Sequence, residues 1–291
     1  MLGLVFVVSL MLEIIPGDPV LLMLSETASR EMKEAVRHQL GLDKPFMQRY
    51  FNYLGKIMQG DLGRSFLKGQ KVAKLVGNAF PATAELAAAS LFVMMLVGLP
   101  IGVLSALFPQ SKVDFFAQMI SLIGVSMPAF WIGLLLIYAF AYRLGLFPLG
   151  GRSGVTSLIL PACSLSMSSV GFLMRIVRVS MLEVMSKEFI TTARSKGLSE
   201  ATVVWKHGLR NATIPIITVL GLQFGRLLGG AVVTEVVFSW PGMGRLIVEG
   251  ILDRDYPLVQ GAILVFGFVF VVINLLIDIS YSIVDPRVRY D

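Results

Sequence analysis

The stretch Leu86–Leu107, LAAASLFVMMLVGLPIGVLSAL, decides the class of fold, because it contains no charged side chain. A helix needs roughly 20 apolar residues to cross a hydrocarbon core of about 30 Å. Four other apolar runs are near or above that length, at Phe115–Tyr142, Leu158–Met174, Ile214–Phe238 and Leu258–Ile283. In lipid, a helix is the only open-ended element whose backbone N–H and C=O groups are hydrogen-bonded within the element itself. The sequence therefore predicts an all-α, polytopic membrane protein.

The overall composition agrees with this class. Hydrophobic residues make up 55% of the chain and charged residues only 15%, whereas soluble domains carry about 25% charged residues. The net charge of +6 comes from dispersed basic residues, so it does not indicate a nucleic-acid partner. One cysteine, Cys163, excludes an intrachain disulfide and a multi-cysteine metal cluster. Phosphate-binding GxxxxGK[ST], HExxH and GxSxG patterns do not occur, so we expect no enzyme activity in this chain and no cofactor.

The N-terminal residues form a shorter apolar run than the others. Met1–Leu12 is apolar, but Glu13 and the break at Pro16-Gly17-Asp18-Pro19 follow almost at once. Twelve helical residues reach only about 18 Å. We interpret residues 1–19 as the end of a first transmembrane helix and a turn, with the helix tilted, or its beginning missing or supplied by residues outside this sequence. The count is then about six transmembrane helices.

Residues 20–80 are too polar to span a membrane. Ser29–Leu40 and Phe46–Ile57 both have helical periodicity with one apolar face. We expect two short amphipathic helices over the outer mouth, in a periplasmic segment. A purely structural, interfacial use and a direct role with a substrate both remain open.

Loop charges give an orientation for the remaining chain, residues 81–284. Basic residues gather in Pro109–Asp114, Glu183–Thr213 and the tail at residues 285–291, whereas Arg143–Ser157 and Ser239–Pro257 hold few. Because short cytoplasmic loops carry an excess of Lys and Arg, we place the first three segments inside the cell. Arg175 and Arg178 are interpreted as the inner end of a helix, reaching out to lipid phosphates.

The cytoplasmic loop at residues 183–213 has the features of a docking element. Gly197 can take the left-handed conformation that ends a helix, and Ser199 can cap a second helix with Glu200 in its first turn. We expect two short helices at an angle, with exposed apolar residues such as Phe189, Ile190 and Leu198. An ordinary surface loop would hide or lack these residues, and exposed apolar patches usually mark interfaces.

The same loop carries a family resemblance. Residues 192–199, TARSKGLS, and 207–212, HGLRNA, resemble the cytoplasmic "EAA" loop of ABC importer permeases of the peptide, nickel and glutathione group. Of the general pattern of such loops only Ala193, Gly197 and Leu209 are retained. Similar matches run along nearly the whole chain, at residues 15–19, 40–45, 60–63, 234–244, 254–257 and 285–287.

The resemblance implies a type I ABC importer permease fold in the bacterial cytoplasmic (inner) membrane. The implied partners are a second homologous permease, two ATPase subunits and an extracytoplasmic solute-binding protein. The implied cargo is a short peptide, with a nickel chelate or glutathione as the alternative. A stand-alone secondary transporter and a membrane scaffold or sensor are the competing classes. The residues assigned to ATPase docking are Phe189, Ile190, Thr192, Ala193, Arg194, Lys196, Gly197, Leu198, Ser199, Glu200, His207 and Arg210.

The Ile214–Phe238 run holds the candidate residues of the translocation path, namely Gly221, Gly225, Arg226, Gly229 and Glu235. Gly221, Gly225 and Gly229 are spaced by four, and small residues at this spacing let helices approach closely. Helix packing and a ligand surface both remain open for this stripe. Arg226 lies near the middle of the run, where a charge costs about 2.5–3.5 kcal/mol on insertion scales. It either faces the path and favours substrates with a carboxylate, or pairs with a counter-ion. The candidate counter-ions are Glu235, Asp278, Glu85 and a group on the second permease.

Overall fold

The computed structural model describes residues 2–14, 20–21, 24 and 28–284. The chain divides into two compact units. Unit 1 consists of Met1–Thr83 and Pro241–Val271, and unit 2 of Ala84–Trp240 and Val272–Asp291. The predicted turn at residues 16–19 and the predicted tail at residues 285–291 lie outside the described residues.

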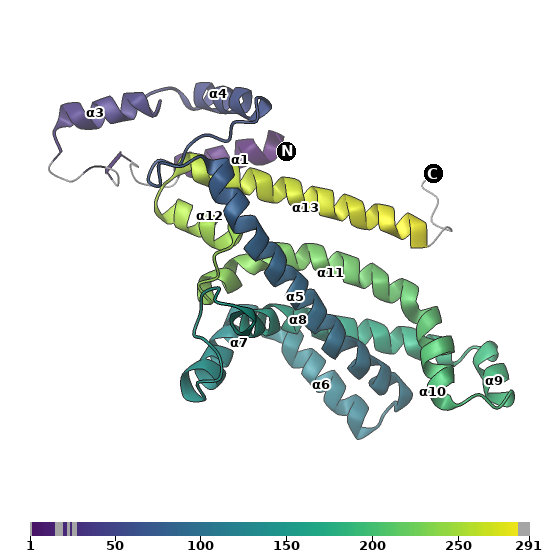
Figure 1. Ribbon diagram of the computed structural model, residues 1–291. Helices are drawn as coiled ribbons and strands as arrows, with labels where there is room; N and C mark the ends of the chain where they lie inside the picture. The colour runs from purple at the N-terminus through teal and green to yellow at the C-terminus, as the bar shows by residue number, and fades with distance from the viewer. Residues whose placement is uncertain (1, 15–19, 22–23, 25–27, 285–291) are drawn as a thin grey trace. The chain divides into compact units, whose positions relative to one another are not determined.

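The described part of unit 1 contains four complete helices, together with the beginnings of two long ones, drawn in Figure 1. The complete ones in its described part are α1 (Leu2–Ile14), α3 (Arg30–Gln39), α4 (Phe46–Met58) and α12 (Met243–Leu252). Ser29 caps α3 by accepting a hydrogen bond from the Met32 amide. Neither α3 nor α4 contains a buried residue. The two amphipathic helices expected from the sequence are therefore confirmed within two residues of their predicted ends.

A buried carboxylate fastens the loop before α5 to the start of α13 within unit 1. Asp255 is buried and accepts hydrogen bonds from the amides of Phe66 and Leu67, at 3.1 and 3.4 Å, and from the Ser65 hydroxyl. Bonds to an ionised acceptor are among the stronger ones in proteins. This network holds residues 65–67 against the first turn of α13.

A second carboxylate of unit 1 lies between two basic side chains. Glu249 accepts from Lys68 Nζ at 3.1 Å and from Arg245 Nε at 2.8 Å. Burial acts to raise the pKa of Glu249, but the hydrogen bonds and charges of its two basic neighbours outweigh burial and lower the pKa below its usual value.

Unit 2 contains the remaining helices and the ends of the two long ones. In chain order they are α5 (Val72–Leu107), α6 (Lys112–Ser126), α7 (Ala129–Leu136), the π-helix η1 (Ile137–Arg143), α8 (Val155–Met185), α9 (Glu188–Ser195), α10 (Glu200–Thr202), the π-helix η2 (Val203–Leu209), α11 (Arg210–Val237) and α13 (Tyr256–Val284). Figure 1 shows α9 beyond the end of α8, joined to α10 by a short loop. The long apolar runs of the sequence lie mostly in helices.

Four helical segments of the described chain are long and apolar enough to span a membrane. They are Val72–Leu107, Val155–Met185, Glu200–Val237 and Tyr256–Ile277. A fifth arises if the bent pair Lys112–Ser126 and Ala129–Arg143 is counted as one span. The predicted number of about six is reached only if the shorter apolar helix Gly3–Ile14 is also counted.

The run Phe115–Tyr142 forms two helical segments and not a single straight helix. The chain bends by 106° between α6 and the α7–η1 segment. Pro128 stands at the first position before α7 and has no amide hydrogen to donate, so the helical hydrogen bonds are interrupted there. Met127, the residue before it, is extended, as the residue before a proline usually is.

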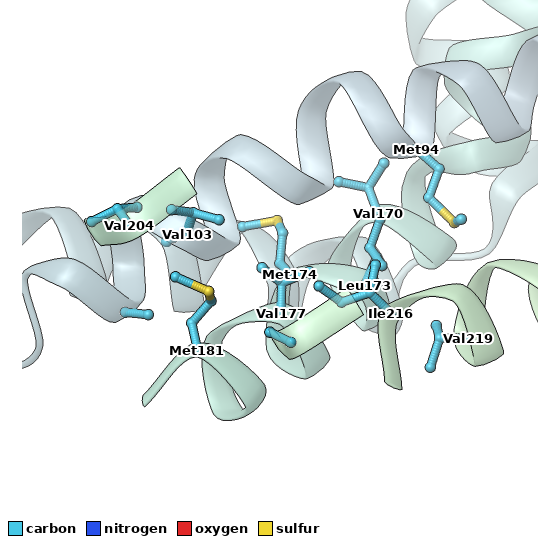
Figure 2. Packing of buried hydrophobic residues seen from close by; sticks show 13 residues of the cluster. Met94, Val103, Val170, Leu173, Met174, Val177, Met181, Val204, Ile216 and Val219 are labelled. Carbon is cyan, nitrogen blue, oxygen red and sulfur yellow. The ribbon is translucent and has the colours of Figure 1, made fainter. Parts of the chain in front are cut away.

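The core of unit 2 is built around α8. Figure 2 shows Val170, Leu173, Met174, Val177 and Met181 following one another along this helix. They pack against residues from α5, η2 and α11, namely Met94, Val103, Val204, Ala212, Ile216 and Val219, and against Ala117 of α6. Because lipid tails are as apolar as these side chains, close van der Waals packing, and not removal from water, stabilises such contacts between membrane helices. Since α8 ends at the predicted docking loop, this core fixes the place of that loop within unit 2.

Candidate functional site

In the predicted docking loop, the first helix ends and the second begins where the sequence predicts. Gly197 follows α9 with φ +76°, the left-handed conformation that a residue with a Cβ adopts only with strain. Its amide donates to the Arg194 carbonyl at 2.9 Å. Ser199 caps the next helix by accepting from the Thr202 amide at 3.4 Å. The chain therefore makes a sharp turn between α9 and α10.

Two predicted contact residues, Ile190 and Ala193, lie inside the loop rather than on its surface. Ile190 is fully buried and packs with Ala193 and Val203, so its expected exposure is wrong. These side chains join α9 to the beginning of η2, with Met185 of α8 beside them. The loop has a small apolar core of its own, which holds α9 at a defined place.

Three apolar side chains of the loop are exposed. Phe189 is 42% exposed, Leu198 40% and Trp205 54%. Arg194 and Glu200 form a two-contact ion pair across the turn, at 2.8 and 3.3 Å. Thr192, Lys196 and Arg210 are also exposed. This combination of apolar and charged groups on a rigid turn suits recognition of another protein.

The sequence suggested that the second helix of the loop is a separate short element, but in the structure it is not. α10, η2 and α11 run on as one helical segment, Glu200–Val237, with Pro215 inside it. The Asn211 side chain donates to the carbonyl of His207 at 2.6 Å. A Cβ on Gly208 would lie 3.1 Å from atoms of Met181 and Met185, so the loop crosses α8 closely. The loop is therefore continuous with a helix long and apolar enough to span a membrane.

Arg226 lies on an exposed face of α11. Within the described part of the chain no carboxylate lies at ion-pair distance from it. Glu85, one predicted counter-ion, pairs instead with Arg152 at 2.7 Å. Glu235 is buried while Arg226 is not. The side chain of Asp278 lies outside the described residues.

The glycines of α11 do not form a uniform stripe. Gly225 is buried, and a Cβ there would lie 3.1 Å from the Asn274 side chain of α13. Gly229 faces open space, with no atom within 4 Å of such a Cβ, and Gly221 is half-buried. Close helix packing therefore explains Gly225 but not Gly229.

The sequence reading missed an ionic cluster that joins α5, α6 and α8. Asp114 is buried and receives two hydrogen bonds from Arg178, at 2.7 and 2.8 Å. Ser105 Oγ, the Gln110 amide and Gln118 Nε2 also donate to it, at 2.5, 2.9 and 2.9 Å. The prediction that Arg178 reaches lipid phosphates is therefore wrong.

Arg175 is likewise engaged within the protein. Its Nε donates to Ser121 Oγ at 3.0 Å, and that hydroxyl donates to the Gly171 carbonyl at 2.7 Å. In the sequence, the two arginines share one face of their helix, and an acidic residue lies in the first turn of another helix. Only this pattern could have indicated either contact.

Two family descriptions together match almost the whole chain. Residues 98–290 match "Binding-protein-dependent transport system inner membrane component", and residues 1–87 match the N-terminal part of such membrane components. The chain belongs to this family. It is a multi-pass inner-membrane permease of the ABC importer class, as the resemblance predicted.

Curated relatives are similar over their full lengths. A putative peptide transport system permease protein of Brucella abortus is 43% identical over 290 residues, which cover 97% of this chain and 92% of the relative. The glutathione transport system permease protein GsiC of Escherichia coli K12 is 40% identical over 297 residues, covering 100% and 97%.

A solved structure supports the fold. The inward-facing MetNI methionine ABC transporter matches with a TM-score of 0.63 and 19% identity, over 72% of this chain and 96% of that one. At this identity the likeness concerns the fold alone.

Proposed function

We propose that this permease forms half of a path for short peptides, and that a second, homologous permease forms the other half. Two ATPase subunits would supply the energy and an extracytoplasmic binding protein the cargo. The exposed face of Phe189, Leu198 and Trp205 on a rigid turn carries this proposal, because it offers an ATPase subunit a surface joined directly to α11.

The names of the relatives support a peptide cargo. The relative from Brucella abortus is named for peptide transport and GsiC for glutathione, which is itself a tripeptide. Glutathione therefore stands as the second candidate. The nickel alternative would have to pass as a chelate, because the described residues hold no group of three or more His, Cys, Asp or Glu side chains that could bind the ion.

The test is co-purification of the complex from native membranes in mild detergent. We expect Leu198→Asp and Phe189→Asp to lower the recovery of the ATPase subunits, since a charge at the centre of an apolar interface is costly to desolvate. Met58→Asp is the matched control, because Met58 is an exposed apolar residue of α4 outside the loop. Equal recovery of ATPase subunits in all three variants would refute the docking role.

Uptake into membrane vesicles tests the cargo. ATP-dependent import of a labelled dipeptide, insensitive to dissipation of the proton gradient, is the expected result. Import that follows the proton gradient without ATP would favour a secondary transporter instead.

A further inference from the structure

Unit 1 contains a cavity of about 450 Å³ that none of the predicted site residues lines. Its walls come from the end of α1, the turn between α3 and α4, one face of α4 and the first turn of α13. Sites for small molecules are typically clefts of about 300–1,000 Å³. The cavity is thus large enough for a small organic ligand.

Two polar atoms on the α4 wall have no hydrogen-bond partner within the described part of the chain. They are Nε of Arg49 and the hydroxyl of Tyr53, and both are shielded from water. The two residues are four apart and so share one face of the helix. Leaving a buried donor unsatisfied costs free energy, and a ligand acceptor that reaches it removes that cost.

Both atoms are hydrogen-bond donors. The Nε–H of an arginine can only donate. Burial, and secondly the charge of Asp61, raise the pKa of Tyr53 above its usual value, so its hydroxyl keeps its proton. An acceptor with two oxygens, such as a carboxylate, matches two donors one helical turn apart. Both atoms are shielded from solvent, so binding requires the two side chains to rotate toward the ligand.

The charges around the cavity favour an anion. Lys44, Arg49 and Lys56 line it, and Glu13, the acidic residue among its lining, is already paired with the Nη2 of Arg49. The basic side chains therefore exceed the acidic ones. Concave sites with charges of one sign raise the local concentration of the opposite sign.

The remaining walls combine flat apolar rings with amide groups. Phe46 and Tyr50 are stacked with ring centroids 6.5 Å apart, and Phe6 meets Tyr50 edge-on at 5.4 Å, which fixes both rings. Gln39 and Asn52 also line the cavity and carry amide donors and acceptors. Side-chain amides suit the amide bonds of a peptide, whereas lipid tails would require a wholly apolar wall.

We propose that this cavity binds the C-terminal carboxylate end of a short peptide, with Arg49 and Tyr53 as the donors to the carboxylate. This inference deepens the proposed function, on which its choice of peptide rests. It assigns to the N-terminal segment a binding role in addition to a structural one.

The test compares the dipeptide alanyl-phenylalanine with its C-terminal amide, using the complete transporter complex in nanodiscs. Direct binding is measured without the external binding protein, and import is measured with it. Tyr53→Phe removes only the unpartnered hydroxyl, and Arg49→Lys keeps a positive charge opposite Glu13. Tyr142→Phe, at an exposed tyrosine of η1 outside the cavity, is the control.

We expect the free dipeptide to bind the wild type about tenfold more tightly than its amide, the scale of a hydrogen bond to a charged group. Tyr53→Phe and Arg49→Lys should remove most of that difference, and Tyr142→Phe should leave it unchanged. Equal binding of the two compounds, or no binding of either, would overturn the proposal.

The two hypotheses fail in different ways. If the complex imports the dipeptide but binds it and its amide equally, the cavity proposal is wrong and the proposed function stands. If binding depends on Tyr53 as expected but the wild type imports no peptide, the proposed function is wrong and the cavity assignment stands.

Discussion

Substitution of Asp114 by asparagine is expected to destabilise unit 2 strongly. Asp114 is 2% exposed and receives five hydrogen bonds, two of them from Arg178. The asparagine has nearly the same shape but cannot neutralise the guanidinium. Removing one partner of a buried ion pair typically costs about 3–5 kcal/mol, because the other charge stays buried. Arg178 is partly exposed, at 24% of its side chain, so we expect the lower end of that range.

The assay is the thermal unfolding of the detergent-solubilised complex. With roughly 2–4 °C per kcal/mol for chains of 150–250 residues, a loss of about 3 kcal/mol lowers the midpoint by about 6–12 °C. Asp43→Asn is the control, because Asp43 meets His38 at 3.7 Å on the surface, where such a pair contributes little.

A double variant separates charge from shape. Asp114→Leu combined with Arg178→Met removes both charges, and such replacements are often neutral or stabilising. It should recover most of the midpoint lost by Asp114→Asn. A midpoint for Asp114→Asn equal to that of the Asp43→Asn control would show that the cluster does not stabilise the fold, and would refute the reasoning.

Three further predictions concern the loop, the pH dependence and the path. Gly197→Ala should cost about 1 kcal/mol of stability, because Gly197 has a left-handed backbone conformation, and it should weaken the stimulation of ATPase activity by peptide. Gly55→Ala, at an open helical position, is the control and should leave that stimulation unchanged. Equal stimulation in both variants would contradict a rigid turn. Lys68 and Arg245 lower the pKa of Glu249 in the folded protein. Ionised Glu249 therefore stabilises the fold above about pH 4.3, the pKa of a glutamate in the unfolded chain. This stabilisation is lost as the pH falls below that value. Glu249→Gln should therefore lower the thermal midpoint at pH 7, and by progressively less as the pH is lowered through the unfolded value and below it; a constant difference would exclude this linkage. Arg226→Leu should leave expression normal and reduce the preference for substrates with a free carboxylate in the uptake assay, whereas loss of the protein from the membrane would assign Arg226 a structural role.

Local patterns were sufficient for the helices and for the turn of the loop. A long apolar run needs no partner to indicate a membrane helix, because the bilayer itself is the solvent that selects it. The positions of Gly197 and Ser199 could also be predicted, since a helix end depends on backbone groups within a few residues. A bend at Pro128 could also be predicted from the local sequence, although its angle could not.

The burial of single side chains within these helices depended on the tertiary structure. Phe189 and Ile190 are neighbours of similar apolarity, but only the packing of Ile190 against Val203 decides which of them faces outward. Nothing in the local sequence distinguishes them, because the partner comes from the next helix.

The separation along the chain between interacting residues divides what the sequence by itself determined from what it did not. The class of protein, the turn of the predicted docking loop and the family follow from runs and motifs read along the chain. The pairing of Asp114 with Arg178, 64 residues away, and the cavity between α1, α4 and α13 required the tertiary structure. These sites join charges and rings that are distant in sequence, and only helix packing brings them within contact range.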